Sequence, residues 1–321
     1  MDKTKLKEIY NRIKAYDKVI ILPHGRPDGD CIGSAIGLKE IIKTSFPDKA
    51  VYVSGEISEF TSFIGTLDTI EDETFKDALV IAVDTANKNR IADQRYEQGA
   101  YLIKIDHHIP VDDYGNMQYV DTTRPAAALI ILDLFYMFQD ELSISEKGIQ
   151  ALYTGILTDT GRFKYEGVDG DTFRRVAMLY DMGLKPQKVY AHIDTKSEAL
   201  VRFKGYVLLN YQKTANGLAY IKITHELCDE YDVSIDEAAS LVNELSVFED
   251  CPVWALFAEY EEKIVRGRLR SKGPVVNEVA NQFDGGGHPM ASGVNLGTWD
   301  RADEIIKALD QLAKDYKSQL D

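Results

Sequence analysis

Several side chains that can bind or orient a metal ion follow short apolar runs in this sequence. The triplet Asp106-His107-His108 comes directly after the run 101–105, and a second cluster of such residues follows the run 19–22. Imidazole nitrogen and carboxylate oxygen together suit Mn²⁺, Fe²⁺, Co²⁺ or Zn²⁺, whereas Mg²⁺ alone favours oxygen ligands. The candidate metal ligands are His24, Asp28, Asp30, Asp84, His107 and Asp159.

The elements that must position these residues are strands of one sheet. Asp84 follows the continuous apolar run 79–83, which is typical of a strand buried on both faces of a parallel sheet. Asp159 follows the run 153–157, which can be interpreted as a strand end, although the wider pattern 146–157 indicates a helix. In an open α/β sheet the carboxyl ends of the strands open on one crevice, where ligands bind. We therefore expect the candidate ligands to meet there.

Six candidate ligands are more than one ion needs. Two ions about 3.5–4 Å apart, bridged by a carboxylate, would use them all. Such a pair stabilises the attacking and leaving oxygens of a phosphoryl displacement, and it makes hydroxide from water near neutral pH. The sequence thus indicates hydrolysis of a phosphoester.

Each motif also has a plainer interpretation. Asp28 and Asp30 are residue types that are common in loops and at helix N-caps. Asp84 could begin a turn, and the two adjacent histidines could be polar residues at a strand end. The arrival of all these groups at strand ends of one α/β domain favours the metal site.

Alternating strands and helices predict the domain organisation. Residues 1–185 are expected to form an α/β domain with a doubly wound parallel sheet. Pro186 breaks the preceding helix and begins a polar helical linker, 186–208. A smaller α/β domain, 209–321, follows. Its predicted elements are a strand at 218–223, a helix at 235–245, a hairpin of 253–260 with 263–270, a helix at about 275–283 and a helix at 300–318.

The amino-acid composition limits the binding partners and the location that we expect for this protein. The formal net charge of −15 opposes steering towards polyanions and tight binding to long nucleic acid. No apolar run approaches the ~18 residues of a membrane span, and the N-terminus has no signal-peptide core. The three cysteines, Cys31, Cys228 and Cys251, are odd in number and widely spaced, so we expect a cytoplasmic protein without a disulfide framework. We expect each to be a core residue, with no cysteine inside a ligand cluster.

The second half contains a candidate anion site. Gly285-Gly286-Gly287 offers a backbone without Cβ atoms that can approach a phosphate, and His288 follows it. Arginines at 266, 268 and 270 have period two and should point to one face of their strand. The plainer interpretations are a flexible glycine turn and a solvated strand face.

These motifs resemble a known family. The loop 24–34, Asp84, the triplet 106–108 and Asp159 are similar to the four motifs of the DHH phosphoesterases. Arg270-Ser271-Lys272-Gly273-Pro274 and the segment 285–288 resemble the DHHA1 substrate domain. The resemblance covers nearly the whole chain. Its two-domain length is most similar to the stand-alone nanoRNase and pAp phosphatase group of firmicutes.

The resemblance implies roles for individual residues. One ion would be bound by His24, Asp28 and Asp84, and the second by Asp30, Asp84, His107 and Asp159, with Mn²⁺ as the expected metal. Asp106 would not bind an ion itself but would orient the side chains that bind the ions, and His108 would face the substrate phosphate. The implied catalytic residues are Asp84, Asp106, His107 and His108, and the implied substrate-binding residues are Arg270, Ser271, Gly285, Gly286, Gly287 and His288.

The implied substrates are oligoribonucleotides of a few residues and 3′-phosphoadenosine-5′-phosphate (pAp), whose 3′-phosphate would be removed. An acidic protein can act on such RNA because it meets only a few phosphates. A cyclic-di-AMP or pApA phosphodiesterase, a family II pyrophosphatase and a non-catalytic nucleotide-binding protein are the alternatives. The sequence leaves open whether the protein forms a homodimer.

One segment departs from the family pattern. Where the group commonly has small hydroxyl residues, residues 126–128 are alanines. A hydroxyl contact to substrate there is in doubt. Arg124 could supply a different phosphate contact, or it could be an exposed loop residue.

Overall fold

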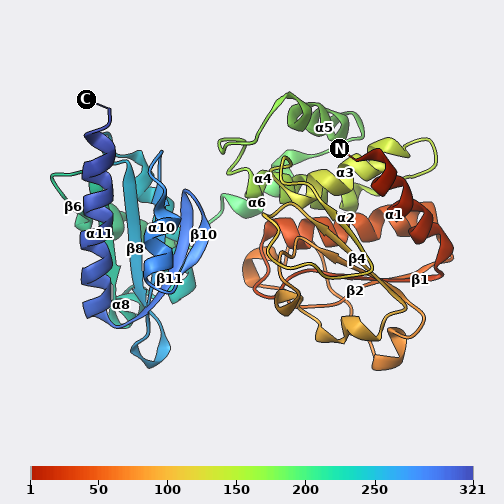
Figure 1. Cartoon of the computed structure of the whole chain (residues 1–321), viewed down its shortest axis with the longest axis horizontal. Coiled ribbons are helices and arrows are strands. Elements are labelled where there is room, and N and C mark those ends of the chain that lie inside the picture. Colours follow the sequence, from red (N-terminus) through yellow and green to blue (C-terminus); the bar gives the residue numbers. More distant parts are fainter. Residues whose placement is uncertain (1, 321) are drawn as a thin grey trace. The chain divides into compact units, whose positions relative to one another are not determined.

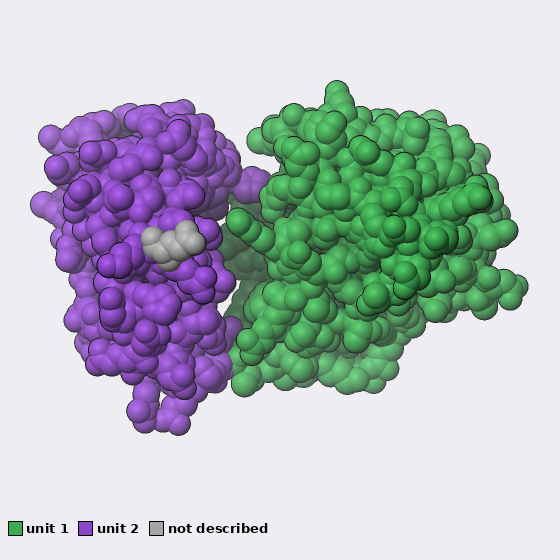
Figure 2. All heavy atoms as spheres, turned by 90° about the horizontal axis from the view of Figure 1, so that it is seen from below, with its two compact units in different colours: residues 1–195 green, residues 196–321 purple. Residues whose placement is uncertain are grey.

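The computed structural model describes residues 2–320, with the backbone alone at Glu262. The chain forms two compact units that divide between Thr195 and Lys196 (Figure 2). This division lies within the range 186–208 that we predicted as a linker. Helix α6 (Pro186–Ile193) belongs to the core of the first unit, and helix α7 (Glu198–Asn210) belongs to a core of the second.

The first unit is built on a five-stranded sheet in the order β2-β1-β3-β4-β5, with every neighbouring pair parallel. This confirms the predicted parallel α/β fold. The crossovers between strands place the carboxyl ends of β1, β3 and β4 side by side. The strands are β1 (Lys18–Leu22), β2 (Ala50–Val53), β3 (Leu79–Val83), β4 (Tyr101–Asp106) and β5 (Met117–Val120).

Different kinds of element pack on the two faces of this sheet. Alternate residues of β1 and β3 enter two separate apolar clusters, as the period of two in a strand requires. One cluster packs the sheet against the α-helices (Figure 1), and the other packs it against loops and short 3₁₀ turns. The α-helices are α1 (Lys3–Ala15), α2 (Gly29–Ser45), α3 (Ala127–Met137), α4 (Glu146–Asp159), α5 (Gly170–Asp181) and α6; the 3₁₀ turns are η1 (Glu59–Thr61), η2 (Asp72–Thr74), η3 (Lys88–Arg90) and η4 (Gln94–Gln98).

Helices α2 and α4 pack backbone against backbone. Gly29, Gly33 and Gly37 recur every four residues along one face of α2. A Cβ atom at Gly33 would lie 2.5 Å from the carbonyl oxygen of Ala151, and one at Gly29 would lie 2.3 Å from Oγ1 of Thr158. Only glycine therefore permits this approach, which brings the start of α2 to the end of α4.

The placement of Asp159 after a strand was wrong. Residues 153–157 are the buried part of α4, and Asp159 is the last residue of that helix. A short apolar run does not distinguish a buried strand from a buried helix face. The close packing of α2 on α4 still brings Asp159 to the ends of the strands.

The loop before α3 is fixed by buried ion pairs. Nε of Arg124 donates to Asp133 at 2.8 Å, and Nε of Arg175 donates to the other oxygen of Asp133, also at 2.8 Å. Arg124 is 8% exposed and Asp133 is 1% exposed. Arg124 is thus not an exposed loop residue, because its guanidinium is paired with Asp133 inside the unit. A phosphate contact from Arg124 stays a prediction.

The second unit contains a six-stranded mixed sheet in the order β10-β11-β9-β8-β7-β6. Strand β8 runs parallel to β7 and antiparallel to β9, so the predicted hairpin of β8 and β9 is confirmed. Apolar clusters lie on both faces of this sheet. The strands are β6 (Gln212–Lys213), β7 (Leu218–Ile223), β8 (Val253–Glu259), β9 (Val265–Ser271), β10 (Gly286–His288) and β11 (Ala291–Gly297); the helices are α7, α8 (His225–Tyr231), α9 (Ile235–Ser240), α10 (Val276–Gln282) and α11 (Trp299–Lys317), with 3₁₀ turns η5 (Leu241–Val247) and η6 (Glu261–Lys263).

The glycine run is not a flexible turn. Gly286 and His288 belong to β10, which pairs with β11 as Gly286 with Gly293 and His288 with Ala291. A Cβ atom at Gly285 would lie 2.4 Å from the carbonyl oxygen of Gly293, so this glycine is required by packing. Among the described residues, no helix is both long enough and apolar enough to cross a membrane.

The glycine contact between α2 and α4 gives a first prediction. Replacing Gly33 by Ala should lower the free energy of unfolding by about 1–3 kcal/mol, because the new methyl group meets backbone atoms that cannot rotate away. Gly205→Ala in α7 is the matched control, since a Cβ there meets nothing within 4 Å and should be neutral or stabilising by up to about 1 kcal/mol. Urea unfolding measures both, and equal effects would contradict the packing argument.

The buried ion pairs give a second prediction. Asp133→Ala should destabilise the protein by about 3–5 kcal/mol, because it leaves two arginines inside the unit without their counter-charge. Glu8→Ala, which removes an exposed partner of Arg12, should cost no more than about 1 kcal/mol. Thermal unfolding of the two variants checks this, and a mild effect of Asp133→Ala would show that water satisfies the arginines.

Candidate metal centre

The loop that carries His24 and Asp28 is anchored at both ends. Gly25 N donates to the carbonyl of Arg90 at 2.6 Å, and Ala92 N donates to the carbonyl of Pro23 at 3.0 Å. Asp28 is the N-cap of α2, and its Oδ1 accepts from the backbone N–H groups of the first turn. Its Oδ2 lies 3.4 Å from Nε2 of His24. The two interpretations of Asp28 are therefore compatible, since one oxygen caps the helix and the other faces the histidine.

Asp84 is in a left-handed backbone conformation, with φ of 54°. Asp tolerates this region better than most residues, and such conformations persist where their surroundings hold them. Here Asp84 N donates to Ile105 O at 2.9 Å, the hydroxyl of Tyr114 donates to Thr85 O at 2.6 Å, and Nζ of Lys104 donates to Ala86 O at 2.9 Å. The turn after β3 is thus fixed, and it points the carboxylate of Asp84 into the site.

Asp30 caps a helix other than its own. The N-cap residue of α3, Ala126, makes no side-chain cap hydrogen bond. Oδ2 of Asp30 instead accepts from Ala127 N at 2.6 Å, and Oδ1 accepts from Ala128 N at 3.0 Å. The alanine segment therefore contributes backbone N–H groups to the site, and they orient a buried carboxylate.

Each of the three histidines is held through Nδ1. The Nδ1 atom lies 2.9 Å from Gly25 O in His24, 3.1 Å from Arg124 O in His107 and 2.8 Å from Asp106 Oδ1 in His108. Because these acceptors take the Nδ1 proton, Nε2 carries the lone pair that can bind a metal. Asp106 Oδ1 also accepts from the backbone N–H groups of both residues that follow it. Asp106 thus fixes the position of the His108 ring and of the backbone that follows β4.

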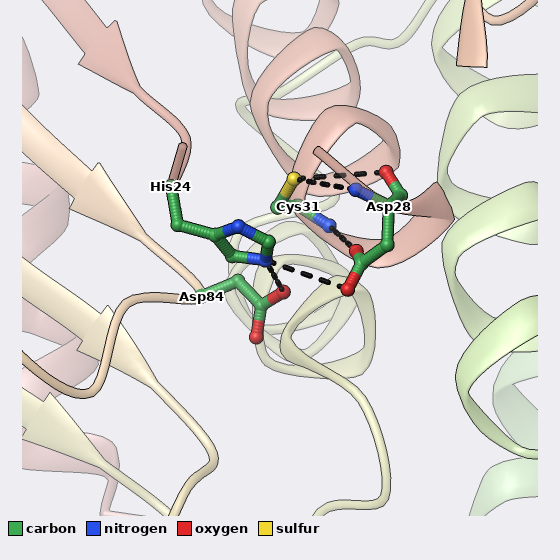
Figure 3. A group of neighbouring side chains, drawn as sticks. All are labelled: His24, Asp28, Cys31 and Asp84. Carbon is green, nitrogen blue, oxygen red and sulfur yellow. Dashed lines mark hydrogen bonds and ion pairs between the residues drawn. The ribbon is translucent and has the colours of Figure 1, made fainter. Parts of the chain in front are cut away.

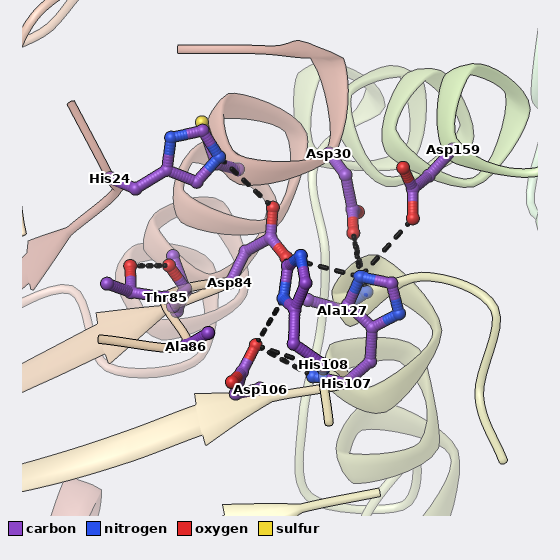
Figure 4. A network of polar contacts seen from close by, with 12 residues as sticks. His24, Asp30, Asp84, Thr85, Ala86, Asp106, His107, His108, Ala127 and Asp159 are labelled. Carbon is purple, nitrogen blue, oxygen red and sulfur yellow. Dashed lines mark hydrogen bonds and ion pairs between the residues drawn. The ribbon is translucent and has the colours of Figure 1, made fainter. Parts of the chain in front are cut away.

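The structure brings the candidate ligands together in three overlapping groups, one of which consists of Asp84, His107 and His108. Asp84 lies between His24 and His107, and His107 lies beside Asp30 and Asp159 (Figure 4). Oδ2 of Asp84 lies 3.6 Å from Nε2 of His24, and Oδ1 lies 3.3 Å from Nε2 of His107. Nε2 of His107 is also 3.3 Å from Asp159 and 3.9 Å from Asp30. We name His24, Asp28, Cys31 and Asp84 the first ligand group, and Asp30, His107 and Asp159 the second ligand group.

The first ligand group contains a residue that we did not predict. Cys31 Sγ lies within 4.8 Å of the ligand atoms of His24, Asp28 and Asp84 (Figure 3). The expectation that no cysteine lies in a ligand cluster was therefore wrong. Cys31 is completely buried, as expected of a core residue, and burial raises the pKa of its thiol to about 12.

The buried carboxyl and imidazole groups of this cluster have shifted pKa values. Burial raises the pKa of Asp30 to about 7, and the Asp84 carboxylate adds to the rise. Burial also raises the pKa of Asp159 well above its ordinary value. Burial would lower the pKa of His107, but the nearby Asp84 carboxylate outweighs it and raises that pKa to about 10. The raised pKa values of Asp30 and Asp159 are those of buried carboxylates with little positive charge nearby. Burial would also raise the pKa of Asp84, but the nearby His107 and His24 outweigh burial and lower that pKa.

The donor set fits divalent ions. No hydrogen bond of acceptable geometry reaches Oδ1 of Asp84 or Oδ2 of Asp106, although both atoms are buried. The nitrogen–oxygen separations of 3.3–3.9 Å exceed ordinary hydrogen bonds. Two ligands that each lie about 2.1 Å from one ion are about 3.0–3.4 Å apart, which is close to these separations. Histidine and carboxylate ligands that share Asp84 can thus hold two ions.

Three of the candidate substrate residues of the second unit, Arg270, Gly286 and His288, lie on one face of its sheet, whereas Gly287 alternates to the other face and Gly285 precedes β10. In the paired strands, Arg270 is in register with Ala291, and Ala291 is in register with His288. Arg268 is in register with Gly293, and Gly293 with Gly286. Ser271 points to the opposite face from Arg270, and its buried hydroxyl donates to Pro274 O.

Sequence reasoning gave no role to Lys104 and Tyr114. Lys104 is completely buried within β4, where it supports the Asp84 turn and lies 3.6 Å from Oδ2 of Asp106. Its Nζ also lies 4.7 Å from the centre of the Tyr114 ring. A lysine within the apolar run 101–105 was the available signal, because a buried lysine needs partners.

Comparison with known proteins supports this description. The DHH family, N-terminal domain, matches residues 18–156, and the DHHA1 domain matches residues 216–315. The chain is 39% identical to a Streptococcus mutans protein named probable bifunctional oligoribonuclease and PAP phosphatase, over 97% of this chain and 100% of that protein. A Bacillus subtilis protein named bifunctional oligoribonuclease and PAP phosphatase is 35% identical over 97% of this chain and 99% of its own length.

A solved structure shows the same fold. It is described as an exopolyphosphatase-related protein from Bacteroides fragilis, and it matches with a TM-score of 0.87 and 26% identity, over 99% of this chain and 98% of that chain. Full-length relatives above 30% identity and the two domain matches show that this chain belongs to the DHH and DHHA1 phosphoesterase family.

Proposed function

We propose that this protein hydrolyses short oligoribonucleotides to mononucleotides and removes the 3′-phosphate of pAp, using two divalent metal ions. The proposed metal is Mn²⁺. The observation that carries the proposal is the pair of ligand groups that Asp84 connects, as a member of the first group and as a neighbour of His107 in the second. The names of the Streptococcus mutans and Bacillus subtilis relatives support the substrate class. The mixture of imidazole and carboxylate ligands supports Mn²⁺ over Mg²⁺.

Two bound ions supply positive charge at the scissile phosphate and a nucleophile at neutral pH. The residues of the chain hold and orient the reacting groups. The first ligand group, without its cysteine, and the second ligand group are the proposed metal ligands. His108 is the most exposed of the three histidines, with 25% of its side chain accessible against 5% for His24 and 10% for His107. We therefore assign His108 to the substrate phosphate, with Asp106 fixing its ring.

The second unit is proposed to bind the rest of the nucleotide. Arg268 and Arg270 point to the same face of the sheet as His288, and all three side chains are at least partly exposed. Guanidinium groups bind phosphate with paired hydrogen bonds, and they stack on bases. The cross-strand row Arg270–Ala291–His288 places two donors on either side of a small residue, which leaves room for a ligand.

Short RNA is favoured over long RNA by charge. A chain with a formal net charge of −15 gains little from binding many phosphates. The few basic side chains on the second unit's sheet can meet only a few phosphates. We also propose a cytosolic location, because the cysteines of the sequence are odd in number and widely spaced. The formation of a homodimer stays a prediction.

A substrate panel tests the proposal. With Mn²⁺, pAp and a dinucleotide RNA should turn over quickly, a long RNA slowly, and cyclic-di-AMP slowly. Asp84→Ala should abolish hydrolysis of every substrate at saturating Mn²⁺, because the first ligand group loses a ligand and the second loses the carboxylate beside His107. Rapid hydrolysis of cyclic-di-AMP with pAp untouched would favour the alternative phosphodiesterase. Full activity of the Asp84 variant would refute the shared site.

The role of the second unit is tested separately. Arg270→Ala should raise KM for pAp and for the dinucleotide by about tenfold or more while kcat changes little, as expected for lost ground-state binding. Arg202→Ala, at an exposed arginine of α7, is the control and should leave both constants unchanged. An unchanged KM in the Arg270 variant would remove this residue from the substrate site.

A further inference from the structure

The sulfur of Cys31 distinguishes the two ligand groups. Its Sγ lies within 4.8 Å of the ligand atoms of His24, Asp28 and Asp84, whereas the second ligand group contains only nitrogen and oxygen donors. Cys228 and Cys251 are also buried, but neither occurs in a ligand group among the described residues. The position of Cys31 is therefore specific to the centre and does not reflect a general burial of cysteines.

The surroundings of this sulfur are polar on one side. The backbone N–H of Asp28 donates to Sγ at 3.3 Å, and the thiol lies 3.6 Å from the carbonyl oxygen of the same residue (Figure 3). An N–H group directed at sulfur favours negative charge on it, as N–H groups do for other anionic acceptors. On its other side Cys31 packs in the main apolar cluster of the first unit.

The start of α2 fixes the sulfur in this position. Cys31 is the third residue of the helix, and its own N–H donates to Asp28 Oδ1 at 3.0 Å. One carboxylate thus ties the cysteine backbone to the loop that carries His24. In addition, Asp84 Oδ2 lies 3.6 Å from Nε2 of His24 within this group, and Oδ1 of the same buried carboxylate, on the side of His107, lacks a hydrogen bond. This carboxylate therefore calls for a cation.

We propose that Cys31 is a sulfur ligand of the first ligand group when the bound ion is thiophilic, such as Zn²⁺, Cd²⁺ or Co²⁺. The inference rests on the metal centre proposed above. On binding, the thiol proton leaves to solvent, and the sulfur donates an electron pair to the ion without any change in oxidation state. Hard ions such as Mn²⁺ prefer oxygen and nitrogen, so with them the thiol stays protonated beside the centre.

The consequence is that the two halves of the centre differ in metal preference. A site with imidazole, carboxylates and one thiolate selects softer ions than a site with imidazole and carboxylates alone. A thiophilic ion should therefore enter the first ligand group before the second. One Zn²⁺ or Cd²⁺ ion at the first ligand group could then coexist with a harder ion at the second.

Cobalt absorption tests this directly. Co²⁺ bound to thiolate gives a near-ultraviolet charge-transfer band that nitrogen and oxygen ligands do not give. Titration of the metal-free protein should produce this band, complete after one equivalent, in the wild type and in the control Cys228→Ser. Cys31→Ser and Cys31→Ala should lack the band but keep the visible absorption of bound Co²⁺. The two Cys31 variants guard against a folding defect in either one.

Competition between ions provides a second measurement. The affinity for Cd²⁺ should fall by about tenfold or more in Cys31→Ser, the range associated with losing a contact of a metal site. The affinity for Mn²⁺ should change far less. Equal losses for both ions would overturn the proposal, as would a thiolate band that survives in both Cys31 variants.

These experiments distinguish a failure of the inference about Cys31 from a failure of the proposed function. If wild-type protein binds Co²⁺ and hydrolyses pAp without any thiolate band, the inference about Cys31 is wrong and the proposed function stands. If the protein neither binds Co²⁺ nor hydrolyses any phosphoester, both the metal centre and the sulfur ligand are refuted.

Discussion

Repulsion among buried carboxylates is the constraint on which the first unit depends. Asp30, Asp84 and Asp106 are each at most 2% exposed. Asp84 approaches both His107 and His108, whereas Asp30 approaches His107 and Asp106 approaches His108. Burying charge without partners is costly, so the fold supplies partners wherever it can. Backbone N–H groups of α3 serve Asp30, and those after β4 serve Asp106. Oδ2 of Asp106 faces the buried Lys104, whereas Oδ1 of Asp84 is left without a hydrogen bond and would be satisfied by a bound cation.

The same residues hold the fold and the centre together. Asp28 caps α2 with one oxygen and faces His24 with the other, while Asp30 caps α3. The glycines of α2 let α4 approach until Asp159 reaches His107. Because each contact serves both purposes, the geometry of the ligands is fixed by the same interactions that fix the helices.

The sequence predicted the central strands β1, β3, β4, β7, β8 and β9 and the parallel sheet, because buried strands follow simple patterns, and it predicted which side chains gather at the carboxyl ends of the parallel strands. It did not predict β5, β6, β10 or β11. It did not place Cys31 in the centre, because we interpreted each cysteine as a core residue. In the structure α2 begins at Gly29, which puts Cys31 in its first turn beside Asp28. Arg124 and the glycine run also needed the structure, since their partners Asp133 and β11 are distant features that no local pattern indicates.

The most direct test of the account is anomalous diffraction from crystals grown with Mn²⁺ and measured at the manganese edge. The account predicts two anomalous peaks that share the carboxylate of Asp84, one beside His24 and the other beside His107. A single peak, or two peaks of which only one contacts Asp84, would contradict the shared centre on which the proposed chemistry depends.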